Sequence, residues 1–150
     1  MICRAAIASA KQSAAVQLLG NYRLQMDGVG EYSITTTPTG ISWDVVTEDP
    51  SGLLVSGATT ITAPTGSVYC IVTGHTRDNN SGTVFTAIVL FKNGGFTPMT
   101  QQNHNGDYST HIIGGVVPCI AGDTFQLAAW GGGTNSDLQQ DSRFSVAFYG

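Results

Sequence analysis

Three histidines are the most versatile candidates for chemistry in this 150-residue chain, because imidazole serves as a metal ligand and as an acid or base near neutral pH. They are His75, His104 and His111. Metal-binding histidines commonly recur at a short spacing, and these three share neither an HxH nor an HxxxH spacing and fall on different expected elements. We therefore expect no metal site.

Nucleophilic and acid–base catalysis find equally little support. Serine and aspartate are plentiful, yet no serine stands in a GxSxG elbow. The carboxylates fall mostly in expected turns, where capping of the turn is their ordinary role; a glycosidase pair among them is the remaining enzymatic alternative. These turn aspartates are Asp49, Asp78, Asp107, Asp123 and Asp137. The sequence predicts a protein that is not an enzyme, with no catalytic residue and no cofactor.

Two polar stretches are candidates for ligand contact. Asp78, Asn79 and Asn80 lie in the stretch 76–82, which lacks the spacing and the closing glutamate of an EF-hand loop, so we expect a polar loop tip instead of a Ca²⁺ site. Trp130 precedes three glycines and the stretch 131–137, and is a candidate platform for stacking on sugar. Trp43 is expected in the core.

The three cysteines, Cys3, Cys70 and Cys119, are odd in number and contain no CxxC pair. They form neither a disulfide framework nor a metal knuckle, and we predict that all three are unpaired. Free thiols fit a protein that folds in a reducing cytoplasm. Cys70 and Cys119 stand in apolar runs and are expected to be small buried side chains.

Charge and hydropathy exclude several partner classes. Only 11% of the residues are charged, the net charge is −4, and the six basic residues are scattered singly, so neither nucleic acid nor a membrane surface is an expected partner. No apolar run reaches the roughly 20 residues that span a bilayer. Arg4 and Lys11 interrupt the alanine-rich start, and we interpret residues 1–30 as a retained, extended N-terminal arm and not as a signal peptide.

The elements that must position these residues are strands. From residue 31 onward, short β-branched and aromatic runs alternate with Gly, Asn, Asp and Pro clusters, which predicts an all-β, two-sheet antiparallel sandwich over residues 31–150. Asn93-Gly94 and Asn105-Gly106 predict hairpin turns. The expected strands are EYSITTT, ISWDVV, ATTITA, SVYCIVTGHTR, TVFTAIVLF, FTPMTQ, DYSTHIIGGVV, DTFQLAAW and RFSVAFY.

Several of these strands are apolar at nearly every position. A strand with one wet face alternates apolar and polar residues, whereas VYCIV, AIVLF, HIIGGVV and SVAFY do not. Both faces of such strands must be covered. Because a sandwich covers only the inner face of each sheet, we expect a second copy of the chain to cover the outer one.

Five segments in order resemble the trimeric jelly roll of the C1q and tumour-necrosis-factor (TNF) superfamily over about residues 41–150. They are ISWD, ITAPTGSVYCIV, LFKNGG, VVPCIAGDTFQLAAW and SRFSVAFYG. The resemblance implies a homotrimeric jelly roll. Similar jelly rolls occur in bacteriophage virions as capsid cement or decoration proteins, head fibres and fibre knobs, and the low charge and odd cysteine count resemble those versions most.

The resemblance leads us to expect a trimeric capsid decoration or cement protein of a tailed bacteriophage. It would fold in the host cytoplasm, reside on the capsid surface, and bind itself and the major capsid protein or another virion protein. The alternatives are a fibre knob that recognises host glycan through the stretches 76–82 and 131–137, and a secreted ligand of C1q or TNF type.

The closing strand gives the most specific expectation. Period-2 alternation over residues 143–149 places Phe144, Val146 and Phe148 in the core and turns Tyr149 to the other face. In the resembled family the second face of this strand meets neighbouring subunits. Tyr149, beside Tyr69, is therefore our candidate for the trimer interface.

Overall fold

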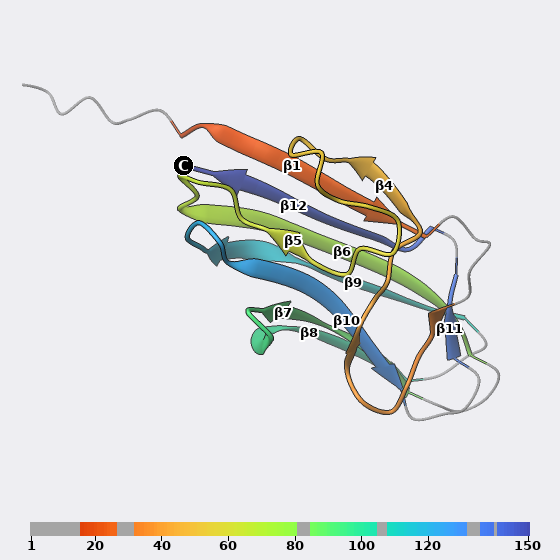
Figure 1. Cartoon of the computed structure of the whole chain (residues 1–150). Helices are drawn as coiled ribbons and strands as arrows, with labels where there is room; N and C mark the ends of the chain where they lie inside the picture. The colour runs from red at the N-terminus through yellow and green to blue at the C-terminus, as the bar shows by residue number, and fades with distance from the viewer. Residues whose placement is uncertain (1–15, 27–31, 81–84, 105–107, 132–135, 140) are drawn as a thin grey trace, which may run out of the picture.

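In the computed structural model, every regular element among the described residues is a β-strand, and the strands form two packed sheets (Figure 1). The structure describes residues 16–26, 32–80, 85–104, 108–131, 136–139 and 141–150. Within these ranges no helix has the length and apolar character that crossing a bilayer requires. The prediction of an all-β, two-sheet antiparallel sandwich is confirmed.

The larger sheet has seven strands in the order β2-β11-β6-β12-β1-β4, with β9 on the other edge of β6. All of its pairs are antiparallel. Its strands are β1 (Leu18–Gln25), β2 (Tyr32–Ser33), β4 (Val45–Glu48), β6 (Tyr69–Asn80), β9 (Tyr108–Pro118), β11 (Ser136–Leu138) and β12 (Arg143–Tyr149).

The smaller sheet has five strands in the order β3-β10-β7-β8, with β5 also on β10. These pairs are antiparallel as well. The strands are β3 (Thr39–Gly40), β5 (Ile61–Thr62), β7 (Phe85–Lys92), β8 (Gly95–His104) and β10 (Thr124–Gly131).

Alternating side chains of the two sheets fill the core between them. Phe144, Val146 and Phe148 of β12 are fully buried, which confirms the face predicted for them. Phe148 packs against Phe125 of the opposite sheet with ring centroids 5.7 Å apart, and Trp43 stacks on Phe144 at 6.2 Å. These aromatic contacts join the layers, and Trp43 is a core residue as expected.

The N-terminal arm predicted over residues 1–30 is too long. Strand β1 lies inside the larger sheet, hydrogen-bonded to β12 on one side and β4 on the other (Figure 1). Successive side chains of a strand point to opposite faces, so Tyr22 and Leu24 face the core and are buried, whereas the polar Asn21 and Arg23 face outward. The domain therefore begins before residue 31. Residues 1–15 and 27–31 lie outside the described residues.

The tight turn at Asn93-Gly94 is confirmed. Asn93 has φ 52° and Gly94 has φ 76°, and this pair of positive angles is the signature of a type I′ hairpin. Lys92 and Gly95 face each other across the turn, so β7 leads directly into β8. The second predicted turn, Asn105-Gly106, lies outside the described residues.

Two expected loops are partly strands. Residues 76–80 complete β6, where Asp78 pairs with Ser109 and Asn79 with Tyr108, so this stretch is not a loop tip. In the stretch 131–137, Gly131 ends β10 and Ser136 begins β11. Long-range pairing overrides the turn preference of Asn and Asp here, because each backbone amide and carbonyl group needs a partner.

Candidate assembly face

The larger sheet turns one face toward the core and the other away from it, and the outward face carries the candidate site. Across that face, Ile71 of β6 stands directly opposite Val116 of β9 and Ala147 of β12. Two residues earlier in β6, on the same face, Tyr69 stands opposite Pro118 and Tyr149. We call this cluster the assembly face; it consists of Tyr69, Ile71, Val116, Pro118, Ala147 and Tyr149.

Tyr69 and Tyr149 stack on each other, with ring centroids 5.1 Å apart and an interplanar angle of 10°. The predicted juxtaposition of the two side chains is therefore confirmed. Both rings are half-buried in the single chain. Tyrosine suits an interface because its ring buries a large apolar area while its hydroxyl group can find a partner.

The aliphatic members of the assembly face are unusually exposed. Val116 is 63% exposed and Ile71 is 40% exposed, and Ile112 of the same β9 face adds a third side chain that is 63% exposed. Scattered apolar residues on a surface are ordinary, but neighbouring ones on a single sheet face mark a binding surface. The sequence analysis pointed to the runs VYCIV and HIIGGVV yet named only the two tyrosines. Period-2 alternation within those runs was the signal for the others.

Strand β7 corrects part of the same expectation. Its run AIVLF is apolar on both faces, as predicted, but Ala87 and Val89 on the face away from the core are fully buried within the single chain. On that face Trp130 stands directly opposite Ala87. A second copy is therefore not needed to cover β7.

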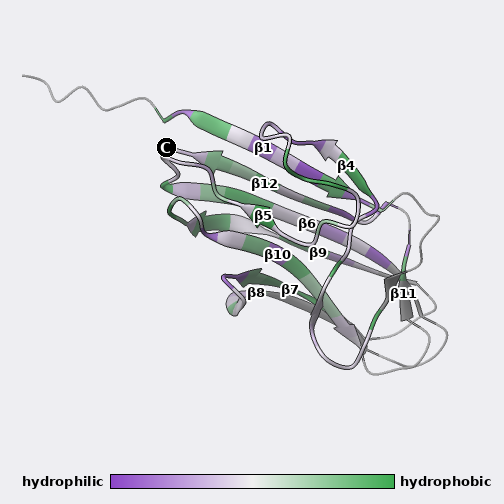
Figure 2. Cartoon of the chain, in the orientation of Figure 1, coloured by the Kyte–Doolittle hydropathy of each residue, from purple (hydrophilic) through white to green (hydrophobic). Residues whose placement is uncertain are grey.

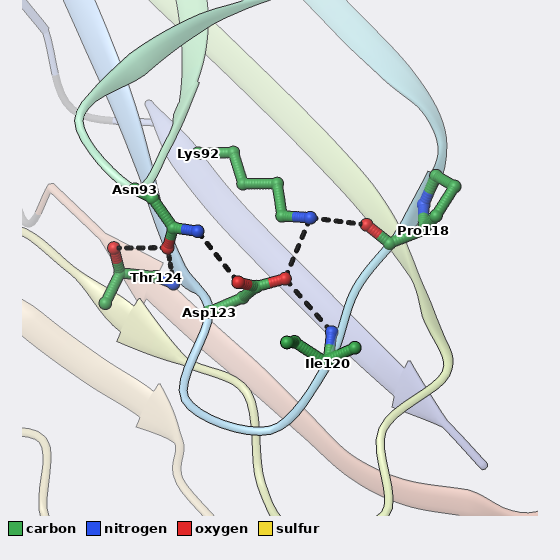
Figure 3. Close-up of polar contacts among 6 residues, drawn as sticks. All are labelled: Lys92, Asn93, Pro118, Ile120, Asp123 and Thr124. Atoms are coloured by element: carbon green, nitrogen blue, oxygen red, sulfur yellow. Dashed lines mark hydrogen bonds and ion pairs between the residues drawn. The ribbon is translucent and has the colours of Figure 1, made fainter.

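A polar cluster holds the two sheets together at one end of the sandwich (Figure 3). The Asp123 carboxylate accepts hydrogen bonds from Lys92 Nζ at 2.8 Å, from Asn93 Nδ2 at 2.7 Å and from the Ile120 backbone amide at 3.0 Å. Lys92 Nζ also donates to the Pro118 carbonyl oxygen at 2.8 Å, which links β7 of one sheet to β9 of the other.

The hydrogen bonds from Asn93 and Lys92 hold the pKa of Asp123 at about 2, below its ordinary value of 3.8. Asn93 Oδ1 in turn accepts from the Thr124 backbone amide at 2.8 Å. Because Asp123 is ionised and fully engaged, it acts as a turn cap and not as an acid or base. The capping role predicted for it is confirmed.

Asp49 is a second confirmed cap. Its carboxylate accepts from the backbone amides of Ser51 at 2.9 Å and Leu54 at 2.7 Å. Asp78 and Asp137, predicted in turns, lie instead within β6 and β11. Asp107 lies outside the described residues.

The thiols of Cys70 and Cys119 are free and buried. They lie within hydrogen-bonding distance of each other, and burial raises the pKa of both; that of Cys70 reaches about 12. A thiol that keeps its proton is a poor nucleophile and a poor metal ligand. Cys3 lies outside the described residues.

The histidines occupy separate environments. His111 is buried and its Nε2 lies 2.7 Å from Thr86 Oγ1, whereas His75 Nδ1 lies 3.0 Å from the Asp141 carbonyl oxygen. His104 ends β8, and its side chain is outside the described set. In the part of the chain that the structure describes, no three His, Cys, Asp or Glu residues gather to hold a metal ion.

The candidate ligand contacts are not brought together. The backbones of Asp78, Asn79 and Asn80 run in the last part of β6, between β9 and β11, and their side chains lie outside the described set. Trp130 is half-buried on the outward face of β10, in the other sheet. These residues form no common surface in the described structure, and their role as ligand contacts stays a prediction.

Comparison with known proteins places the fold. No protein-family model matches the sequence, and no curated protein matches it. Solved structures with low sequence identity are similar to the chain. The globular domain of zebrafish complement 1qA has a TM-score of 0.59 at 10% identity and covers 87% of this chain and 95% of its own.

Two further structures are similar to a comparable degree. Murine APRIL has a TM-score of 0.58 at 13% identity and covers 85% of this chain and 98% of its own. Eiger TNF from S. frugiperda has a TM-score of 0.59 at 14% identity and covers 88% of this chain and 92% of its own. The chain therefore has the C1q/TNF-like jelly-roll fold.

Proposed function

We propose that this chain is a non-enzymatic assembly protein that forms homotrimers through the assembly face. The observation that carries the proposal is the exposed cluster around the stacked Tyr69 and Tyr149 on the outward face of the larger sheet. Proteins with C1q/TNF-like folds typically trimerise, and the sequence resemblance implies that the corresponding sheet meets neighbouring subunits. The chemistry of this face supports the same use here.

The physical reason is the hydrophobic effect. Burial of the exposed side chains of Ile71 and Val116 stabilises an assembly by about 25 cal/mol for each Å² of apolar surface removed from water. In a closed ring of identical subunits every copy of the face is covered, whereas in an isolated chain the face stays exposed to water.

We propose further that the trimer is a structural protein of a tailed-phage virion, a capsid decoration or cement protein. The low charge and the free, buried thiols support this role. So do apolar side chains outside the assembly face, such as Leu53 at 82% and Phe96 at 66% exposure, which offer contacts to a second partner such as the major capsid protein.

Imaging of native particles tests the virion role. The proposal expects trimeric density of this chain at repeated positions on the capsid surface. Density confined to a tail-fibre tip would favour the glycan-recognising knob instead, and particles without the chain would contradict both.

Alanine substitution of Tyr149 tests the assembly face. We expect Tyr149→Ala to stay folded and β-rich but to dissociate into monomers on dilution, because the stacked pair is lost from the interface. The matched control is Phe96→Ala, which removes an aromatic ring that is 66% exposed on the other sheet and should leave association unchanged. Light scattering over a dilution series reads both; a trimeric Tyr149→Ala variant would contradict the proposal.

Phe148 provides the opposite test on the same strand. Its ring is fully buried against Phe125 and Tyr22, so Phe148→Ala should lower the free energy of unfolding by roughly 3–5 kcal/mol. The protomer should unfold and not merely dissociate. Folded Phe148→Ala monomers would mean that the two faces of β12 are reversed.

A further inference from the structure

A groove of about 570 Å³ opens on the same face of the larger sheet, away from the two tyrosines. Along β6, the residues change from hydrophobic near the chain's C-terminus to hydrophilic toward β11 (Figure 2). The groove lies over β1, β6 and β12 and takes in part of β4. Its lining residues are Arg23, Leu24, Gln25, Thr47, Thr73, His75, Arg143, Phe144 and Ser145.

Strand register fixes the arrangement of the polar side chains. Arg143 of β12 stands directly between Gln25 of β1 and His75 of β6. Two residues later in β12, on the same face, Ser145 stands between Arg23 and Thr73. Two arginines and a histidine thus lie beside two small hydroxyl side chains on one sheet face, on strands that are widely separated in the sequence.

The charge of this groove opposes that of the chain as a whole. The net charge is −4, yet two of the six basic residues line the groove, and no carboxylate is among the described residues that line it. Glu48 lies just outside and pairs with Arg23 at 3.4 Å. That ion pair is weak because the two side chains are 59% and 42% exposed to solvent. An anion that makes more hydrogen bonds with the Arg23 guanidinium group can therefore replace Glu48.

His75 is held in one orientation. Its Nδ1 lies 3.0 Å from the Asp141 carbonyl oxygen, which only accepts hydrogen bonds, so Nδ1 carries the proton. In that tautomer Nε2 has a lone pair, so it accepts a hydrogen bond from a ligand hydroxyl group and does not donate to an anion. Arginine forks bind the oxygens of phosphate, sulfate and carboxylate groups through paired hydrogen bonds, and the hydroxyl groups of Ser145 and Thr73 add further donors.

We propose that this groove binds an oxyanion, the phosphate, sulfate or carboxylate group of a ligand, through Arg143 and Arg23, with His75 Nε2 as an acceptor for a hydroxyl group of the same ligand. The site goes beyond the proposed trimer and does not depend on it. The volume leaves room for more than the anionic group, so a small organic molecule such as an acidic or phosphorylated sugar fits the groove.

Titration of the full chain with inorganic phosphate, sulfate and acetate tests the site. At constant ionic strength set by chloride, we expect saturable NMR shifts centred on the amides of Thr73, His75, Arg143 and Ser145. The anion that binds most tightly identifies the preferred group. Arg143→Gln should weaken its binding about ten-fold or more, which corresponds to about 1.4 kcal/mol.

The matched control is Arg77→Gln, which removes the same charge from the same face of β6 but lies outside the groove. It should change the affinity by less than about two-fold, because the long-range attraction of an exposed charge is screened by salt. Equal weakening by both variants, or shifts that never saturate, would overturn the site. Arg23→Gln repeats the test if Arg143→Gln fails to fold, and light scattering on each variant keeps failure of the site distinct from failure of the trimer.

Discussion

The carboxylate of Asp123 stabilises the end of the sandwich where the polar cluster lies. Its hydrogen bonds from Asn93, Lys92 and Ile120 connect the β7–β8 hairpin to the turn between β9 and β10. Because its folded-state pKa of about 2 lies below the ordinary 3.8, it stabilises the fold fully above the ordinary value. That contribution is lost as the pH falls through about 2.

Substitution of this residue should therefore have a pH-dependent effect. We expect Asp123→Asn to lower the free energy of unfolding by roughly 1–3 kcal/mol at neutral pH, since it leaves partly buried donors without a charged acceptor. The difference from the unmodified chain should shrink as the pH drops from 3.8 to about 2. Denaturant unfolding at several pH values measures both effects.

Asp141→Asn is the matched control, because Asp141 lies on an exposed turn after β11 and its positive φ of 78° is one that asparagine adopts readily. It should change the free energy of unfolding by less than about 0.5 kcal/mol. If both variants gave the same pH profile, the Asp123 carboxylate would not stabilise the fold through these hydrogen bonds.

The two buried thiols give a second residue-scale prediction. Burial raises the pKa of Cys70 to about 12, so the thiolate that reacts with alkylating reagents is scarce at neutral pH. We expect Cys70 and Cys119 to remain unmodified in the native protein and to react once it is unfolded. Mass spectrometry without reduction should show all three cysteines unpaired; an intramolecular disulfide would refute this.

At the scale of elements, the sequence predicted the long strands and the Asn93-Gly94 hairpin because their signals are local. Strand β1 had a local signal as well, the alternation of Tyr22 and Leu24 with Asn21 and Arg23, but the alanine-rich residues before it favoured an arm. The expected strand EYSITTT contains β2, whereas β3 and β11, of two and three residues, were not predicted. Only their partners across the sheet define them, and a single sequence does not reveal those partners.

The same limit applies to the site. Tyr69 and Tyr149 were predicted side by side because the family resemblance relates their two strands. The groove around Arg143 was not predicted, since Arg23, His75 and Arg143 come from three strands and show no local motif. Register alone brings them together.

Deletion of N-terminal segments tests the position of β1. Removing residues 1–15 should leave both sheets intact, because β1 begins at Leu18. Removing residues 1–26 should unfold the domain, since β12 loses a hydrogen-bonded neighbour and Phe148 loses the edge contact of Tyr22 at 5.6 Å. Circular dichroism and thermal unfolding distinguish the outcomes; a folded chain without β1 would contradict its place in the sheet.

At the scale of the whole molecule, burial is uneven. In the smaller sheet the outward side chains of Ala87 and Val89 are buried within the single chain. In the larger sheet the outward side chains of Ile71, Ile112 and Val116 are exposed to water. This asymmetry is the physical basis for assigning assembly to one face. On that face, the apolar cluster that we propose for self-association and the basic groove that we propose for an anion consist of different residues.

The most direct test of this account is the mass of the unmodified chain in solution. Sedimentation equilibrium at micromolar concentration should give about 47 kDa, three times the 15.7 kDa of one protomer. The value should hold at high salt, because burial of apolar surface and not ion pairing drives association. A mass of 15.7 kDa across the concentration range would contradict the proposed trimer.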